Sequence, residues 1–258
     1  MFFKISSKRY IWSPIKIMSD SLVIIPTYNE KENIEKMIRK VHSLPKAFHV
    51  LIVDDGSPDG TADIVKKLQL EFPESLHMEQ RKGKLGLGTA YIHGFKWGLE
   101  KGYDFIFEMD ADFSHPVDKL PALYEACAKD GYDFSIGSRY VKGGGVSNWD
   151  KKRLFLSYFA SIYVRSILWV SIKDTTAGYM CYSRKVLETI DLDSIKFIGY
   201  AFQIEMKYTA TRLGFKGKEV PITFKDRELG NSKMDTSIFK EAIFGVFKLK
   251  FKKIKAKN

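Results

Sequence analysis

Cysteine is scarce in this sequence of 258 residues, and the motifs of several enzyme classes are missing. The two cysteines, Cys127 and Cys181, lie far apart without a C-x-x-C spacing. This excludes a disulfide-stabilised scaffold and a zinc site built from cysteines, and it favours a reducing compartment. Because neither G-x-S-x-G nor H-E-x-x-H occurs, an α/β hydrolase and a zinc-dependent peptidase are excluded as well.

Long uninterrupted hydrophobic runs are also lacking. The best candidate for a membrane span, residues 154–172, carries Arg165 past its middle, where an arginine costs about 2.5–3.5 kcal/mol. We therefore expect this segment to form a helix that is buried or lies at an interface. Residues 1–18 lack the apolar core and cleavage site of a signal peptide, so we interpret them as a disordered extension or a mis-assigned start.

Acidic residues are absent from both ends of the chain, which accounts for most of the net charge of +11. Residues 1–18 carry four basic residues, residues 248–258 carry six lysines, and the stretch between them is nearly neutral. A nearly neutral domain argues against nucleic acid as a partner, because nucleic-acid binding needs a basic face. The basic tail, with Phe251 and Ile254, instead predicts peripheral attachment to an anionic lipid surface on the cytoplasmic face of a membrane.

What the sequence does contain is a regular alternation of apolar runs and helical segments, which is typical of an α/β fold with a mostly parallel sheet flanked by helices. We expect one domain at residues 19–247, between an N-terminal extension, 1–18, and the basic tail, 248–258. The expected strands are 21–28, 49–57, 76–80, 104–110, 133–138, 179–182 and 218–224. The expected helices are 30–43 with Asn29 as its N-cap, 61–71, one from about 88 to 102, 116–129, one from about 151, 200–213 and one from about 236.

Acidic side chains cluster where two of these strands end. Asp54-Asp55 ends the second strand and Asp110-Ala111-Asp112 ends the fourth. Ligands of open parallel sheets bind at the carboxyl ends of the strands, and a spacing of two puts both carboxylates on one side. That arrangement suits a hard divalent cation, although aspartates at such places also cap helices and turns. For Asp59 and Asp63 we favour the capping role.

Two other features carry little information on their own. The basic, glycine-rich segment 81–88 has neither of the glycine patterns that bind nucleotide phosphates, so we interpret it as a flexible loop. Four scattered histidines do not have the spacing of metal ligands, and we interpret them as surface or packing residues; they are His42, His49, His77 and His93.

Several motifs follow one another along the chain, and their order is far more specific for a protein family than any single motif. They are I-P-T-Y-N-E at 25–30, V-D-D-G-S-P-D-G-T at 53–61, M-D-A-D at 109–112, G-S-R-Y at 137–140, F-Q-I-E-M at 202–206 and P-I-T-F-K-D-R at 221–227, with Trp149, Arg153, Gly230, Ser232 and Lys233. Over residues 20–247 the sequence resembles the inverting glycosyltransferases of family 2, and among them the dolichol-phosphate (polyprenol-phosphate) mannosyltransferases. The resemblance implies a single Rossmann-like nucleotide-sugar transferase domain of GT-A type.

The resemblance also implies roles for individual residues. The implied nucleotide-sugar site comprises Pro26, Tyr28, Glu30, Val53, Asp55, Asp110, Ala111, Asp112, Arg139, Arg227 and Lys233. Within it, Asp110 and Asp112 are the implied ligands of Mg²⁺ or Mn²⁺, and the implied catalytic residues are Asp112, Arg139 and Arg227. Arg139 and Arg153 are the implied contacts of the acceptor phosphate.

Two positions depart from the pattern of that family. Ser114 stands where some members offer an amide, which leaves a third protein ligand to the metal unsupported. Asp150 replaces the typical proline after Asn-Trp, a change that we expect to alter the acceptor loop.

The implied activity is transfer of mannose from GDP-mannose to a polyprenyl (dolichyl-type) phosphate with inversion. A divalent cation and basic side chains would neutralise the departing diphosphate. The acceptor phosphate, with a second pKa of about 6, is already ionised at pH 7 and needs no strong base. The resemblance leaves room for a membrane subunit as partner. The alternatives are another nucleotide sugar, such as UDP-glucose, and a non-catalytic membrane-binding protein.

Overall fold

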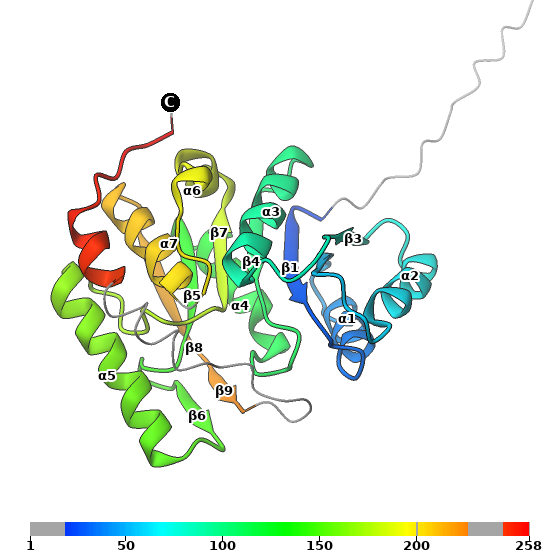
Figure 1. Cartoon of the computed structure of the whole chain (residues 1–258), viewed down its shortest axis with the longest axis horizontal. Helices are drawn as coiled ribbons and strands as arrows, with labels where there is room; N and C mark the ends of the chain where they lie inside the picture. Colours follow the sequence, from blue (N-terminus) through cyan, green and yellow to red (C-terminus); the bar gives the residue numbers. More distant parts are fainter. Residues whose placement is uncertain (1–18, 200, 227–244, 258) are drawn as a thin grey trace, which may run out of the picture.

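Seven strands form the central sheet of the computed structural model, which describes residues 19–199, 201–226 and 245–257 (Figure 1). Their order across the sheet is β3 (Leu76–Gln80), β2 (His49–Asp54), β1 (Ser21–Thr27), β4 (Phe105–Glu108), β7 (Met180–Ser183), β5 (Phe134–Ser138) and β8 (Gly217–Pro221). Within this sheet β7 alone runs antiparallel to its neighbours. The predicted, mostly parallel sheet is therefore confirmed, and the carboxyl ends of β1, β2 and β4 lie side by side at one edge.

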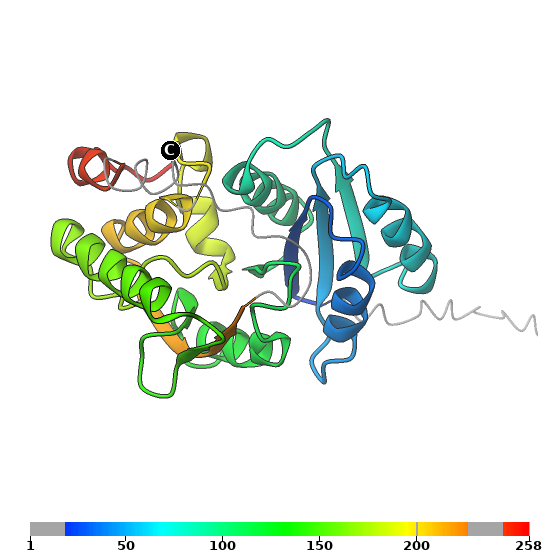
Figure 2. The same ribbon diagram turned by 60° about the horizontal axis from the view of Figure 1, so that its bottom comes forward.

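Helices cover both faces of the sheet, as Figures 1 and 2 show. One face packs against α1 (Ile34–His42), α2 (Thr61–Glu71) and α4 (Leu120–Ala128), which follows the short helix η1 (Val117–Lys119). The other face packs against α3 (Leu87–Glu100), α6 (Arg184–Thr189) and α7 (Ala201–Arg212), with the short helix η2 (Leu192–Ser194) between the last two in sequence.

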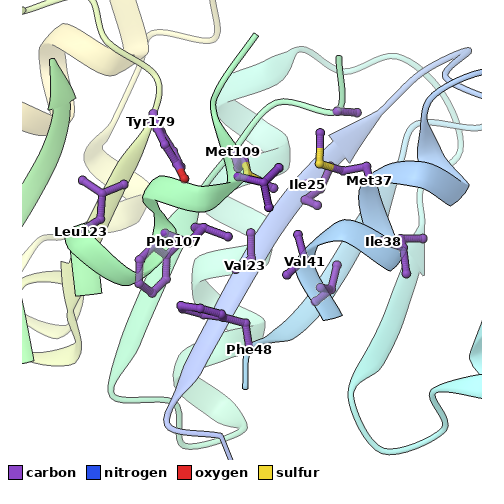
Figure 3. Close-up of a cluster of buried hydrophobic side chains, with 14 of the residues drawn as sticks. Val23, Ile25, Met37, Ile38, Val41, Phe48, Phe107, Met109, Leu123 and Tyr179 are labelled. Atoms are coloured by element: carbon purple, nitrogen blue, oxygen red, sulfur yellow. The ribbon is translucent and has the colours of Figure 1, made fainter. Parts of the chain in front are cut away.

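The apolar run of β1 explains why it occupies the middle of the sheet. Val23 and Ile25 point to one face, where they pack with Met37 of α1 (Figure 3). Leu22 and Ile24 point to the opposite face. Each of these side chains is fully buried, and each such burial stabilises the fold by about 1.5–3 kcal/mol. A strand that is apolar on both faces is stable only between two helical layers.

A smaller unit lies beside β5 and β8. Strand β6 (Gly145–Ser147) pairs in parallel with β9 (Thr223–Lys225), and α5 (Lys151–Leu168) follows β6. A C-terminal helix, residues 245–251, packs along α5, and a shared apolar cluster buries Val164, Leu168, Val246 and Leu249. Among the described residues, no helix combines the length and the apolar character that a membrane span requires.

Three local expectations are wrong. Helix α1 begins at Ile34 rather than residue 30, because Asn29 adopts a left-handed φ of 58° and residues 30–33 form a turn before the helix. The expected strand at 218–224 breaks at Ile222 into β8 and β9, which join different sheets. Short helix α6 was not expected at all.

The C-terminal tail differs as well. The expected boundary between 247 and 248 lies inside the helix 245–251. Beyond that helix, Ala256 forms an isolated bridge with Ile190, and the side chain of Lys252 donates to Glu205 at 2.7 Å. These residues therefore pack against the domain. The N-terminal extension and most of the segment between β9 and the C-terminal helix lie outside the described residues.

The close approach of α3 to β1 gives a stability prediction. A Cβ on Gly94 would lie 2.7 Å from Cδ1 of Ile24. We expect Gly94→Ala to lower the free energy of unfolding, because an overpacking cost of about 1–3 kcal/mol exceeds the gain of about 1 kcal/mol in helix propensity. Urea unfolding measures this. Gly83→Ala is the control, since nothing lies within 4 Å of its Cβ position; equal stability of the two variants would contradict the packing argument.

Candidate active site

A cavity of about 1180 Å³ lies along the carboxyl edge of the sheet and continues beside α5. The structure brings most of the predicted site residues to its wall: Pro26, Tyr28, Glu30, Asp55, Asp110, Ala111, Asp112, Arg139 and Arg153. Val53 does not reach this wall, because its side chain belongs to the core cluster on the α3 face. Arg227 and Lys233 lie outside the described residues.

The Asp110–Asp112 segment is a turn, which corrects the expectation that it continues a strand. Strand β4 ends at Glu108, so the period of two does not explain why both carboxylates face the cavity. Phe113 adopts a left-handed φ of 61°, which is uncommon for a bulky residue and reverses the chain direction here. The backbone N–H of Ser114 donates to Oδ1 of Asp112 at 3.0 Å, which closes the turn.

His115 holds the other end of this turn. The backbone N–H of Asp110 donates to Nδ1 of His115 at 3.1 Å, so the proton of the neutral ring is on Nε2. The ring stacks on Tyr179 with centroids 4.9 Å apart, and Phe224 meets it edge-on. Burial lowers the pKa of His115 to about 4, so the imidazole is neutral near pH 7.

The donor set of this turn fits a hard divalent cation. Carboxylate oxygens are the ligands that Mg²⁺ and Mn²⁺ prefer. Asp110 and Asp112 both line the cavity, and Tyr91 donates to Oδ1 of Asp110 at 3.3 Å, which orients that carboxylate. Among the described residues, no group of three or more histidine, cysteine, aspartate or glutamate side chains could hold a metal ion. A cation at this turn would therefore need further ligands from a bound diphosphate or water.

Arg139 is fixed by a buried carboxylate. Its Nε donates to Oδ2 of Asp174 at 2.7 Å, its Nη2 donates to Oδ1 at 2.6 Å, and its backbone N–H also donates to Oδ2. Asp174 is fully buried. Burial would raise the pKa of Asp174, but the charge and hydrogen bonds of Arg139 outweigh it and hold this pKa below its usual value. Nη2 also donates to Thr176, so the guanidinium has one orientation in the cavity.

A second arginine, Arg153, lies near the same aromatic ring as Arg139. The guanidinium carbon of Arg153 is 4.3 Å from the ring centre of Trp149, and that of Arg139 is 5.6 Å from the same centre. Arg153 also forms an ion pair with Asp226 at 2.7 Å, where both side chains are about one-third exposed. Asp150 caps α5 by accepting the backbone N–H of Arg153 at 2.8 Å, so this departure from the family pattern starts the helix that carries Arg153.

Two more buried charges lie behind the cavity wall. Lys207 of α7 donates to the carbonyl oxygen of Ala177 at 2.5 Å. Burial lowers the pKa of Lys207 to about 8 and raises the pKa of Glu108 to about 8, and the opposite charge of each partner opposes both shifts. Each group also interacts with a cavity residue of like sign, since Asp110 raises the pKa of Glu108 and Arg139 lowers the pKa of Lys207.

The aspartates that follow β2 have structural partners. Asp54 is fully buried and accepts hydrogen bonds from Thr27 and Ser57. Asp55 lines the cavity, and its Oδ1 accepts a hydrogen bond from Arg81 at 2.6 Å, which ties the loop of residues 81–86 to the site. The capping role of Asp59 is confirmed, because its side chain accepts the backbone N–H of Thr61 at the start of α2.

The far end of the cavity is apolar. Its wall there consists of residues from α5 and the C-terminal helix: Leu156, Phe159, Ala160, Tyr163, Val164 and Val246. Five apolar or aromatic side chains of α5 are more than one-third exposed, namely Leu154, Phe155, Leu156, Tyr158 and Phe159. This end is open to a hydrophobic ligand.

Four residues of this site were not among those predicted from the sequence: His115, Asp174, Gln203 and Lys207. For His115 a local signal existed, since it follows Asp110 by five residues and can fold back on the same turn. Gln203 lies within the F-Q-I-E-M motif, but the motif alone does not place its amide in a cavity. Asp174 and Lys207 are defined by tertiary contacts across the sheet, which no sequence spacing reveals.

Comparison with known proteins agrees with this geometry. The sequence profile described as Glycosyl transferase family 2 matches residues 22–191. The polyprenol monophosphomannose synthase of Mycolicibacterium smegmatis is 50% identical over 226 residues, which are 88% of this chain and 85% of that protein. The undecaprenyl-phosphate mannosyltransferase of Micrococcus luteus is 47% identical over 225 residues, which are 87% of this chain and 91% of that protein.

Solved structures share the fold at low identity. Glucosyl-3-phosphoglycerate synthase from Mycobacterium tuberculosis has a TM-score of 0.65 and 17% identity, and the match covers 89% of this chain and 79% of that one. The mannosyltransferase PcManGT from Pyrobaculum calidifontis, solved with GDP-Man and Mn²⁺, has a TM-score of 0.56 and 15% identity over 89% of this chain and 69% of that one. The expected GT-A-like fold is therefore confirmed.

The hydrogen bond to Asp110 gives a testable prediction. His115→Phe keeps an aromatic ring against Tyr179 but removes the acceptor of the Asp110 N–H, and an unsatisfied donor costs about 1–3 kcal/mol. We expect lower stability in urea and faster hydrogen exchange of the Asp110 amide. His115→Asn is the matched control, because its Oδ1 can replace Nδ1 as the acceptor. Unchanged amide exchange in the phenylalanine variant would contradict this role.

Proposed function

The chain belongs to glycosyl transferase family 2 and is a glycosyltransferase, and from this premise we propose that it transfers mannose from GDP-mannose to a polyprenyl phosphate with inversion. One observation carries the proposal: a single cavity joins the carboxylates of the strand ends, two arginines and an apolar wall. A nucleotide diphosphate suits the first end, and a lipid that carries a phosphate suits the second. The names of both relatives, which cover most of this chain, support mannose as the sugar and a polyprenyl phosphate as the acceptor.

The turn after β4 forms the part of the cavity that would bind the donor, which we call the donor half. Asp110 and Asp112 would hold Mg²⁺ or Mn²⁺ together with the diphosphate of the donor. The cation, when bound, neutralises charge on the departing diphosphate. Tyr91 and His115 keep the turn in one shape before the substrate arrives, which spares reorganisation during the reaction. Pro26, Tyr28, Glu30 and Asp55 line the part of the cavity where the nucleoside would lie.

Two arginines mark the part of the cavity that would bind the acceptor phosphate, which we call the acceptor half. Arg139 and Arg153 flank Trp149, so two positive charges face the region between the donor turn and α5. An acceptor phosphate held there would exchange solvent for charge-assisted hydrogen bonds from guanidinium N–H groups. For Arg153 the phosphate would compete with Asp226, an ion pair weakened by its partial exposure.

The reaction is a single displacement. An oxygen of the acceptor phosphate attacks the anomeric carbon, a new carbon–oxygen bond forms, and the bond to the diphosphate breaks on the opposite face. The electron pair leaves with GDP. Because the phosphate is ionised near pH 7, no residue has to remove a proton, and the neutral His115 is consistent with this.

Membrane attachment would bring the lipid phosphate to this cavity. The C-terminal helix packs against α5, where Phe247 meets the ring of Tyr163, and it carries the exposed Phe247 and Phe251. Neither residues 151–168 nor residues 245–257 contain an acidic side chain. This combination favours peripheral binding to an anionic leaflet, with α5 next to the bilayer. We propose that this leaflet is the cytoplasmic one, on the side from which the proposed donor, GDP-mannose, would bind.

Donor identity and stereochemistry are tested together. We expect thermal stabilisation by GDP and GDP-mannose with Mn²⁺ to exceed that by UDP and UDP-glucose. GDP-mannose and a short polyprenyl phosphate should then give a product whose anomeric configuration, determined by NMR, is inverted. Preference for UDP-glucose would overturn the donor, and a retained configuration would overturn the displacement.

The metal role predicts the effect of Asp112→Asn. Turnover should fall on the order of 10²-fold or more, because an electrostatic stabiliser of the transition state is lost, while urea unfolding stays close to that of the wild type. Asp118→Asn is the matched control, since Asp118 is exposed and does not line the cavity. Full wild-type turnover in excess chelator would rule out the metal.

The membrane role predicts a selective loss of vesicle binding. Phe155→Asp and Phe251→Asp should each weaken co-sedimentation with anionic vesicles at least about tenfold, because each places a negative charge on the surface that faces the lipid. Leu70→Asp is the control, because Leu70 is 85% exposed on α2, far from α5 (Figure 1). Equal binding by all three variants would contradict this surface. Single substitutions test this surface better than truncation after Phe247, because the truncation would also remove Leu249, which is buried in the fold.

A further inference from the structure

A buried amide in the cavity wall has no hydrogen bond. Gln203 lies near the start of α7, is 2% exposed, and lines the cavity. Neither its Oε1 nor its Nε2 finds a hydrogen-bond partner among the described residues. The carboxyl of Glu108 is close enough for the amide to influence its pKa, but no hydrogen bond of acceptable geometry joins them. Buried polar groups are nearly always satisfied, so this amide offers hydrogen-bonding capacity to the cavity that the described residues do not use.

Helix α7 fixes the amide beside the segment that orients Arg139. Lys207 lies one turn after Gln203 on the same face of the helix. Its ammonium group donates to the carbonyl oxygen of Ala177, and the next residue, Gly178, lines the cavity. Thr176, just before Ala177, accepts a hydrogen bond from Arg139. Gln203 is therefore held beside segment 176–178, whose first residue accepts a hydrogen bond from Arg139.

The same helix is also tied to the donor half. The ring of Phe202 stacks on that of Tyr91 with centroids 6.0 Å apart and an interplanar angle of 8°. The hydroxyl of Tyr91 in turn donates to Asp110. Helix α7, which carries the Gln203 amide, thus contacts both the residue that orients Asp110 and the segment that contacts Arg139. The transferred sugar has to lie between the donor diphosphate and the acceptor phosphate.

The residue of the cavity wall that faces the Gln203 amide is Gly178, which has no side chain. A Cβ on Gly178 would lie 3.6 Å from Nε2 of Gln203 and 3.8 Å from Cε1 of His115. The space in front of Gly178 is therefore bordered by an amide, which both donates and accepts, and by an imidazole with its proton on Nε2. A diphosphate only accepts hydrogen bonds, whereas sugar hydroxyl groups donate and accept. The gap is the size of a methyl group, since the added Cβ would touch both side chains at ordinary contact distance, so it admits a hydroxyl group of a sugar whose ring lies in the adjoining cavity.

We propose that Gln203 is a specificity-determining residue whose amide binds hydroxyl groups of the transferred hexose in the space left by Gly178. The proposal rests on the proposed function only in requiring that the chain bind a nucleotide hexose. A site that hydrogen-bonds a substrate hydroxyl group discriminates strongly against analogues that lack or misplace it, because the buried polar group is then left unpaired.

The experiment distinguishes the contribution of the sugar to binding from that of the nucleotide. Titration calorimetry with Mn²⁺ compares GDP, which has no sugar, with GDP-mannose, and steady-state kinetics compares GDP-mannose with GDP-glucose. We expect Gln203→Leu to weaken GDP-mannose binding by about 10–100-fold, to leave GDP binding within about threefold, and to reduce the preference for mannose. Gly178→Ala should produce the same selective loss by filling the space with a methyl group.

Further measurements separate this role from a structural one. Gln203→Leu should unfold in urea no more easily than the wild type, because it removes an unsatisfied buried amide. Gln80→Leu, at an exposed position outside the cavity, is the matched control. Equal weakening of GDP and GDP-mannose, or no change in either, would overturn the proposal. If Gln203→Leu does not fold, Gly178→Ala decides by the same comparison.

An error in the proposed donor can be distinguished from an error in the role of Gln203. If the wild type binds UDP-glucose and not GDP-mannose, the proposed donor is wrong. The comparison of UDP with UDP-glucose in the same variants then tests Gln203 without change of design.

Discussion

The buried ion pair between Arg139 and Asp174 is the contact on which the rest of the site depends. Desolvation of two charges is costly, and it is offset here by direct hydrogen bonds between the two groups, while Glu219 holds the backbone of Asp174 by accepting its N–H. Because Asp174 is fully buried, its partner cannot turn to solvent. The guanidinium is thus preorganised, and a phosphate that reaches it meets a positive charge that needs no rearrangement.

This rigidity contrasts with the second arginine. Arg153 is held by one exposed carboxylate and by the face of Trp149. An exposed ion pair is worth about 0–1 kcal/mol, so another anion displaces it at little cost. The fixed cation lies toward the donor turn, and the exchangeable one lies on α5, beside the apolar end of the cavity. That order suits an acceptor whose phosphate enters from the side of its hydrocarbon chain.

The sequence predicts those parts of the molecule that follow from local pattern. The apolar runs of β1 and β2, the acidic residues after the strands and the cap at Asp59 are all local features, and the structure contains them. Antiparallel β7 and the partners of Arg139 depend on which segments meet across the sheet. Gln203 was quoted only as part of a motif, because burial without a hydrogen bond becomes visible only in three dimensions.

The lysine-rich end shows why surface charge cannot be counted from sequence alone. Six lysines predict an anchor to which each contributes equally, yet Lys252 is bound to the buried Glu205 and to the carbonyl oxygen of Ser194. Glu205 also accepts the backbone N–H groups of Lys196 and Phe197, which precede Ile198 and Gly199 in the cavity wall. One of the lysines therefore fastens the C-terminal helix to the site. The attraction to lipid depends on the remaining lysines and on the aromatic side of α5, so the element that would meet the bilayer also forms the wall of the cavity.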